Sequence, residues 1–229
     1  VRLVDDLEAD AGIRTLVLVG EGSKFFCAGA DLKLFADGDS GTAAVMSQAF
    51  GRAFERLSAY RGVSIAAING YAMGGGLEVA LACDLRVAEA QAQLALPEAS
   101  VGLLPCAGGT QLLPHLVGEG WAKRLILLGE RIDAATAERI GLVEQVVPAG
   151  EALPAALAMA ERAARQSPDS VVACKRLVQA ARTVPPALNL PLERELFVGL
   201  FAGSNQQEGV GAFLQKRPPV WQVAGKEHA

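Results

Sequence analysis

Apolar residues in the first half of the chain gather into short runs that alternate with amphipathic stretches. Four runs have the length and composition of buried strands: 14–20, 63–68, 84–88 and 94–97. Three other stretches place apolar residues at helical spacing or follow a glycine turn, and they predict helices: 1–11, 43–60 and 77–83. Strands that alternate with helices indicate an α/β core.

From Thr110 onward the pattern becomes helical. Periodic apolar positions predict helices over 122–128, 134–140, 151–164, 170–181, 192–202 and 206–215, with breaks at Gly141, Pro148 and the pair Pro185-Pro186. The sequence therefore predicts two regions. Residues 1–132 form the α/β core, and residues 133–229 form a C-terminal region of helices alone.

Composition places the chain among ordinary globular proteins. Of 229 residues, 51% are apolar and 20% are charged, which is enough for a sizeable core without crosslinks. The net charge of -4 is spread without long runs of either sign, which argues against nucleic acid as a partner. Purely apolar stretches are far shorter than the ~20 residues that a membrane-spanning helix needs.

The four cysteines stand far apart, at positions 27, 83, 106 and 174. Their spacing provides no Cys-x-x-Cys pair, so we expect neither a zinc site nor a redox motif, and no other metal site is predicted. Cysteines used in this way fit a reducing cytoplasm best. Because the chain opens at Val1, an upstream targeting segment is not tested by this sequence.

Two glycine-rich segments follow predicted strands. Residues 72–78 read Ala-Met-Gly-Gly-Gly-Leu-Glu, and a helix that starts among glycines exposes unpaired N–H groups and its positive dipole end. Residues 25–33 again bring small side chains after a strand, so one amide from each segment could form an oxyanion hole. The alternative is a pair of tight turns that only allow close packing.

Two glutamates lie near these segments. Glu78 stands in an apolar helix start, where a carboxylate is costly to bury without a partner or a role, although it could simply interact with the helix dipole. Glu98 precedes the loop 102–111, which is rich in glycine, and it could be an ordinary surface carboxylate. Cys106, in the same loop, is interpreted as a small buried apolar residue rather than a nucleophile.

In order and spacing, the three segments around residues 25–33, 72–78 and 96–111 closely resemble the crotonase superfamily, and among its members the enoyl-CoA hydratases. Further matching stretches are 68–71, 82–86, 128–132, 137–143 and 209–216. The resemblance implies a spiral of β-β-α turns with a helical C-terminal trimerisation region. A β-hairpin that normally precedes the first helix is lacking, so we expect the start of the family fold to be missing.

The resemblance also implies the chemistry. It assigns the N–H groups of Ala30 and Gly75 to the oxyanion hole and the acid/base work to Glu78 and Glu98. We therefore expect a hydro-lyase that adds water across the α,β double bond of a 2-enoyl-CoA, in a pathway such as β-oxidation. A Δ3,Δ2-enoyl-CoA isomerase or another acyl-CoA reaction is the alternative, and a non-catalytic acyl-CoA-binding subunit is a hypothesis of another class.

Residues around coenzyme A follow from the same resemblance. It places Lys24, Ala28, Asp31, Leu32 and Lys33 against the coenzyme, which is part of the substrate, so no separate cofactor is expected. Two C-terminal positions, Phe197 and Lys216, would meet the coenzyme from a neighbouring subunit of a homotrimer or hexamer. The acyl pocket is expected from Leu32, Phe35, Met73 and residues after Ala43, and Cys106 stands where hydratases usually have glycine.

Overall fold

The computed structural model describes residues 1–222, and these contain two four-stranded sheets. The first sheet has the order β1-β3-β5-β8 and is parallel throughout; its strands are Thr15–Val19, Val63–Ile68, Leu85–Glu89 and Gln145–Val147. The second has the order β2-β4-β6-β7, with only the last pair antiparallel; its strands are Phe25–Cys27, Tyr71–Met73, Gln93–Ala95 and Ile132–Asp133. The chain passes from one sheet to the other in each repeat, which is the predicted β-β-α spiral.

The central strand β3 is buried on both faces. Ala66 and Ile68 belong to the core shared with α3 (Gly75–Ala82) and α4 (Gly109–Leu127). Ile65 and Ala67 alternate with them and pack against α6 (Ala152–Ala164) on the other side. A strand covered by helices on both faces favours apolar residues on both, which explains the uninterrupted apolar run from Ile65 to Ile68. The buried hydroxyl of Ser64, before this run, pairs with the Asp84 carboxylate.

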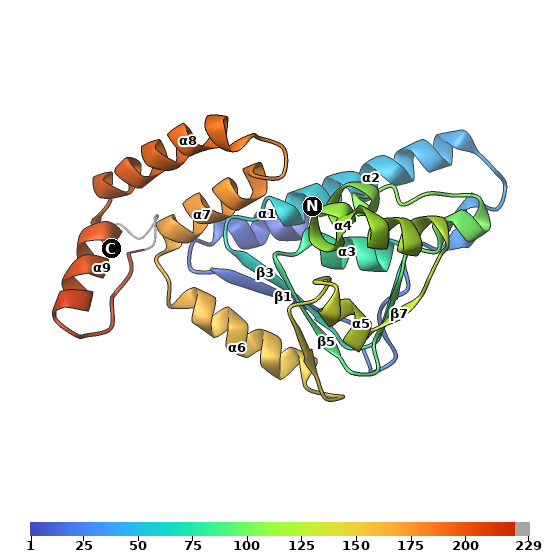
Figure 1. Cartoon of the computed structure of the whole chain (residues 1–229), viewed down its shortest axis with the longest axis horizontal. Coiled ribbons are helices and arrows are strands. Elements are labelled where there is room, and N and C mark those ends of the chain that lie inside the picture. Colours follow the sequence, from blue (N-terminus) through green and yellow to red (C-terminus); the bar gives the residue numbers. More distant parts are fainter. Residues whose placement is uncertain (223–229) are drawn as a thin grey trace.

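Helices surround these sheets. The N-terminal α1 (Arg2–Ala9) and the long α2 (Ser40–Ser58) precede β3, and α5 (Ala134–Arg139) follows β7. In Figure 1, α2, α3 and α4 lie above the sheets and α6 lies below them. Short 3-10 turns cover Leu32–Phe35, Glu98–Val101 and Leu200–Ala202. The site described below lies among α2, α3 and α4.

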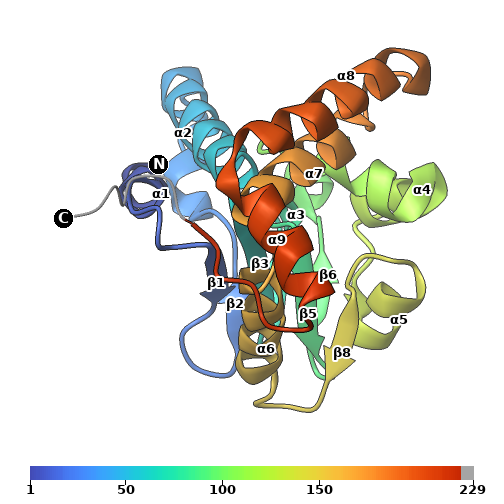
Figure 2. The same cartoon turned by 90° about the vertical axis from the view of Figure 1, so that its left-hand side faces the viewer.

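The last helices leave the body of the molecule at one end. Helix α7 (Pro168–Ala180) packs beside the core, whereas α8 (Pro186–Gly199) and α9 (Ser204–Leu214) continue outward (Figure 1). Figure 2 views this end directly, with α9 in front of the sheets. We call residues 186–214 the C-terminal arm.

A buried arginine links β5 to the segment that follows α5. The Arg86 guanidinium donates to the backbone oxygens of Leu142 (2.8 Å) and Cys83 (3.0 Å), and it pairs with Glu144 at 2.5 Å. Because a buried cation needs partners on every side, this arrangement fixes the chain leading into β8. The motif at residues 82–86 thus has a structural role.

The expectation of helices alone after Thr110 was wrong. β7 and β8 lie in that region, and β8 pairs with β5 inside the first sheet. Strands of two or three residues are too short to show the alternation that identifies a strand, and the same reason hid β2 and β4. The division at residue 132 stays a prediction, while β8 and α6 beyond it pack on the first sheet.

Candidate active site

The turn into α3 packs against the loop after β2 through glycines. Gly29 has a positive φ of 89°, and a Cβ there would lie 2.7 Å from the carbonyl oxygen of Met73. A Cβ on Gly76 would lie 2.0 Å from the carbonyl oxygen of Cys27, closer than real atoms come. Only glycine allows the two backbones to come this close. The two segments are therefore tight turns that pack closely, as the alternative interpretation of the sequence expected.

The same approach brings two backbone amides together. A Cβ on Gly75 would lie 3.9 Å from the amide nitrogen of Ala30, so the two N–H groups border one small space. Within residues 1–222, neither N–H donates a hydrogen bond. Gly75 also stands at the start of α3, where the helix dipole favours negative charge. The geometry suits an oxyanion.

Glu78 lies one turn further along α3 and is only 2% exposed. Its Oε1 accepts the N–H groups of Ala107 and Gly109, each at 2.8 Å. Burial raises the pKa of this carboxyl, and the two N–H donors act in the opposite direction. Its Oε2 lies 4.0 Å from the place that a Cβ on Gly75 would occupy, so it borders the oxyanion site.

Glu98 opens the 3-10 turn after β6 and is half-buried. Burial raises the pKa of its carboxyl, and the negative charge of Glu78 raises it further. Its Oε1 lies 3.1 Å from the position of a Cβ on Gly74, in the turn that starts α3. Its Oε2 is buried and has no hydrogen-bond partner among the described residues. The surface-carboxylate interpretation of Glu98 was therefore wrong.

Cys106 differs from its sequence interpretation. We expected a small buried residue, but the side chain is exposed. The residue is exposed as a whole, but partial burial of its sulfur and the charges of Glu78 and Glu98 raise the pKa of its thiol. Glu78 holds the loop 102–111 through Ala107 and Gly109, and Cys106 lies at the edge of the site.

An open groove of about 510 Å³ adjoins the outer side of this loop. It is lined by α2 and the residue after it, the end of α3, the loop, the first turn of α4 and one residue of α7: Gly51, Phe54, Glu55, Ser58, Ala59, Ala82, Pro105, Cys106, Ala107, Gly108, Thr110, Gln111, Leu112 and Gln179. We call it the α2 groove. Its volume suits a small-molecule ligand. Of the expected acyl-pocket residues, those after Ala43 line it, whereas Leu32, Phe35 and Met73 do not.

The residues expected around coenzyme A fall into two groups. Ala28, Asp31, Leu32 and Lys33 are exposed on the segment around Ala30, and the Asp31 carboxylate accepts the N–H of Lys33 at 3.0 Å. Lys24 is also exposed, but it precedes β2 and lies at the other end of that strand. Phe197 and Lys216 are also exposed, but they belong to α8 and to the segment after α9, at the other end of the molecule (Figure 1). One chain brings only the first group to the site.

The sequence did not reveal the two donors that hold Glu78. The backbone N–H groups of Ala107 and Gly109 are not marked by any residue type. In this loop the sequence had drawn attention to Cys106 instead. The residue type that could have indicated this contact is the glycine at position 109. A Cβ there would lie 3.1 Å from Oε1 of Glu78, so a larger residue would crowd the carboxylate.

Comparison with known proteins agrees with this geometry. A family model described as enoyl-CoA hydratase/isomerase matches residues 2–224. The 2,3-dehydroadipyl-CoA hydratase of Escherichia coli (strain K12) is 41% identical over 222 residues, covering 96% of this chain and 86% of that protein. A short-chain-enoyl-CoA hydratase of Clostridium acetobutylicum is 34% identical over 219 residues, covering 94% and 82%.

Solved structures show the same likeness. The structure of Pseudomonas aeruginosa DspI has a TM-score of 0.94 and 63% identity, covering 96% of this chain and 84% of that one. An enoyl-CoA hydratase from Bacillus anthracis has a TM-score of 0.92 at 37% identity, covering 96% and 85%. With its fold, its paired carboxyl groups and these relatives, the chain belongs to the enoyl-CoA hydratase/isomerase family of the crotonase superfamily.

Proposed function

We propose that this protein is a 2-enoyl-CoA hydratase, a hydro-lyase that forms a 3-hydroxyacyl-CoA. The observation that carries the proposal is the placement of two carboxyl groups with raised pKa, Glu78 and Glu98, beside a pair of unpaired amides. Addition of water to a conjugated thioester needs a base, an acid and a site for the oxyanion, and this arrangement can supply all three.

The different surroundings of the carboxyl groups suggest their roles. Two N–H donors favour the ionised form of Glu78, so in the proposal Glu78 takes a proton from water as the hydroxyl adds to Cβ. The electron pair of the double bond moves to the thioester oxygen, which the N–H groups of Ala30 and Gly75 stabilise. Glu98, whose buried oxygen has no donor in residues 1–222, is then the acid that protonates Cα. Proton exchange with solvent restores both groups.

Two other functions fit parts of the site. A Δ3,Δ2-enoyl-CoA isomerase moves one proton between two carbons, for which a single carboxyl group suffices. A non-catalytic acyl-CoA-binding subunit would need the amides but neither carboxyl group. The burial of two glutamates next to the same turn is costly without a use for both, and this favours hydration.

A direct assay separates these functions. The absorbance of the conjugated thioester in crotonyl-CoA should fall as 3-hydroxybutyryl-CoA forms, while a 3-enoyl-CoA incubated in parallel should not be converted at a comparable rate. Faster conversion of the 3-enoyl-CoA would identify an isomerase. Binding of both compounds without any turnover would identify a non-catalytic subunit.

We further propose that the active form is a cyclic trimer or a hexamer made of two trimers. On the C-terminal arm, Phe197 is 62% exposed and Phe213 is 82% exposed, and Phe197 packs edge-to-face on Phe201 at 5.5 Å between ring centres. Such apolar groups gain stability when a neighbouring subunit covers them. In a trimer, Phe197 and Lys216 would reach the coenzyme bound by a neighbour.

The proposal includes no cofactor apart from the coenzyme A portion of the substrate. We propose that the protein works in the cytoplasm, because all four cysteines are free thiols in the structure. No helix within residues 1–222 is long and apolar enough to span a membrane.

A further inference from the structure

The α2 groove borders the loop that holds Glu78. It is lined there by Cys106 and Ala107, and Ala107 donates its N–H to Glu78. Its lining includes Ala82, the last residue of α3. Gly75 and Ala82 are seven residues apart, which corresponds to about 10 Å at the rise of an α-helix. Gly75, Glu78 and Glu98 do not line the groove, so the entry of an acyl chain from the oxyanion site is part of the proposal below.

The groove is also lined by the C-terminal part of α2 and by α7. Gln179 of α7 lines it, and its Nε2 donates to the carbonyl oxygen of Ser58 at 3.0 Å, beside the end of α2. Glu55 lines it from α2, three residues before Ser58, and it is exposed. We call this part of the groove its distal end. Of the groove's lining residues, which all fall within 1–222, Glu55 is the one that carries a charge.

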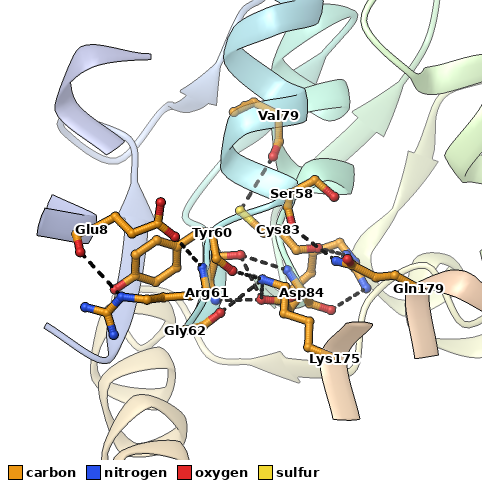
Figure 3. Close-up of polar contacts among 12 residues, drawn as sticks. Glu8, Ser58, Tyr60, Arg61, Gly62, Val79, Cys83, Asp84, Lys175 and Gln179 are labelled. Atoms are coloured by element: carbon orange, nitrogen blue, oxygen red, sulfur yellow. Dashed lines mark hydrogen bonds and ion pairs between the residues drawn. The ribbon is translucent and has the colours of Figure 1, made fainter. Parts of the chain in front are cut away.

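Cations close to this end are directed elsewhere. Lys175 lies one turn before Gln179, but its Nζ donates into the core, to the carbonyl oxygens of Tyr60 (2.7 Å) and Gly62 (3.0 Å). It also pairs with Asp84 at 2.7 Å, as the close-up in Figure 3 shows.

On α2, Arg56 follows Glu55 directly in sequence but pairs with Asp5 and Glu8 of α1. Arg52 donates its Nε–H to the carbonyl oxygen of Gln48 and does not line the groove. The distal end therefore presents one negative charge, an amide and no lining cation among the described residues.

We propose that Glu55 and Gln179 form the distal end of the acyl-binding groove, and that Glu55 selects acyl chains with an uncharged tail over chains that end in a carboxylate. This inference rests on the proposed function and names its substrate class. Two carboxylates brought to the same groove end repel each other, and no cation in the lining offsets this. The selectivity thus differs from that implied by the name of the Escherichia coli relative, a 2,3-dehydroadipyl-CoA hydratase.

The test compares substrates of equal length that differ only in their end group. One pair is 2-hexenoyl-CoA and 2,3-dehydroadipyl-CoA; the other is 2-octenoyl-CoA and its counterpart with a terminal carboxylate. We expect kcat/KM to favour the methyl end about tenfold or more in at least one pair. Because Glu55 is exposed, the preference should weaken as salt concentration rises.

Variants assign the preference to the groove end. Glu55→Gln should lower this preference at least about threefold, and Gln179→Glu should increase it. Glu161→Gln is the matched control, because it removes an exposed charge from α6, on the opposite side of the first sheet, and should leave the preference unchanged. Equal kcat/KM within both pairs, or a preference that Glu55→Gln leaves intact, would overturn the inference.

Binding measurements keep this test separate from the hydratase proposal. Saturated hexanoyl-CoA and adipyl-CoA undergo no hydration, so calorimetric Kd values for the wild type and Glu55→Gln report the groove alone. If no enoyl-CoA is hydrated but hexanoyl-CoA still binds more tightly in a Glu55-dependent manner, the hydratase proposal fails and the groove inference stands. If hydration occurs while the two saturated ligands bind equally, the groove inference fails.

Discussion

The spiral core and the C-terminal arm are stabilised in different ways. In the core, β3 is covered on both faces, Arg86 has several buried acceptors, and Glu78 is almost completely buried. On the arm, large apolar side chains stand in solvent, including Phe197, Phe201 and Phe213. The core covers β3 and pairs Arg86 and Glu78 within one chain, whereas the arm leaves its large apolar side chains uncovered.

This contrast separates two requirements of the proposed reaction. Oxyanion stabilisation and proton transfer need groups held rigidly, and the core provides them through glycine packing and backbone donors. Binding of the large coenzyme can use a surface completed by a neighbour. We therefore expect core substitutions to act on kcat, and arm substitutions to act on assembly and substrate binding.

The largest effect should come from the two carboxyl groups. Replacing either Glu78 or Glu98 by glutamine should lower kcat at least about 100-fold, because a positioned acid or base contributes this much. Glu78→Gln keeps an oxygen that can accept the N–H groups of Ala107 and Gly109, so the loop should stay in place. Steady-state kinetics with crotonyl-CoA and a separate binding measurement check this; unchanged turnover in either variant would refute the assigned chemistry.

A somewhat smaller loss should follow when the oxyanion site is displaced. Gly29→Ala introduces a Cβ 2.7 Å from the carbonyl oxygen of Met73 and 3.2 Å from the nitrogen of Gly75. We expect a fall in kcat of about 10- to 100-fold, because a hydrogen-bond donor would be moved away from the developing charge.

Gly38→Ala is the matched control. Gly38 also has a positive φ, 70°, but a Cβ there would contact nothing within 4 Å. It therefore adds the backbone strain without moving the oxyanion site. Equal losses in the two variants would mean that strain, and not displacement of Gly75, causes the effect.

On the arm, Phe197→Asp should dissociate the proposed trimer and weaken acyl-CoA binding about tenfold or more, because a charge would enter an apolar contact. Sedimentation at micromolar concentration and calorimetry measure the two effects. Phe197→Leu, which keeps an apolar side chain, should retain the assembly. A wild-type protein that is monomeric and has full hydratase activity would contradict the proposed trimer. The arm would then have no role in assembly.

The smallest expected effect is on stability. The folded-state pKa of Glu98 is raised above its ordinary value of 4.5, so its contribution is fully favourable below that pH and is lost as pH rises through the folded-state pKa. Above pH 4.5 the raised pKa costs stability, because the unfolded chain releases the proton of Glu98 more readily than the folded chain does. Glu98→Gln should therefore raise Tm by roughly a few degrees at pH 7 and by less at pH 4. An equal change in Tm at both pH values would contradict this titration.

Much of the architecture could be predicted from local pattern. Segment 65–68 is apolar at every position because helices cover both faces of β3, and the whole strand 63–68 was identified with its observed bounds. The three glycines at 74–76 suggested a turn that could bind an oxyanion. The pairing of Glu78 with Glu98 beside two amides came from the resemblance to the crotonase superfamily, because each glutamate taken alone also had a simpler interpretation.

Other features depend on contacts between distant segments. The short strands β7 and β8 form because they pair with the edges of sheets that other strands have built. The sequence of two or three residues does not reveal such a pairing. The hydrogen bonds from Ala107 and Gly109 to Glu78 come from backbone N–H groups, which nearly every residue has. Residue types therefore do not predict them.

The sequence by itself determined the strand-helix alternation, the buried β3 and the residue types of the site, because burial and periodicity are local properties of the chain. Only the tertiary structure decided that Cys106 is exposed, that Glu98 has a buried oxygen without a donor in the described chain, and that Lys175 pairs with Asp84 and does not line the groove. These three features depend on contacts between side chains and backbone groups. Such contacts are set by the packing of segments that lie many residues apart in the sequence.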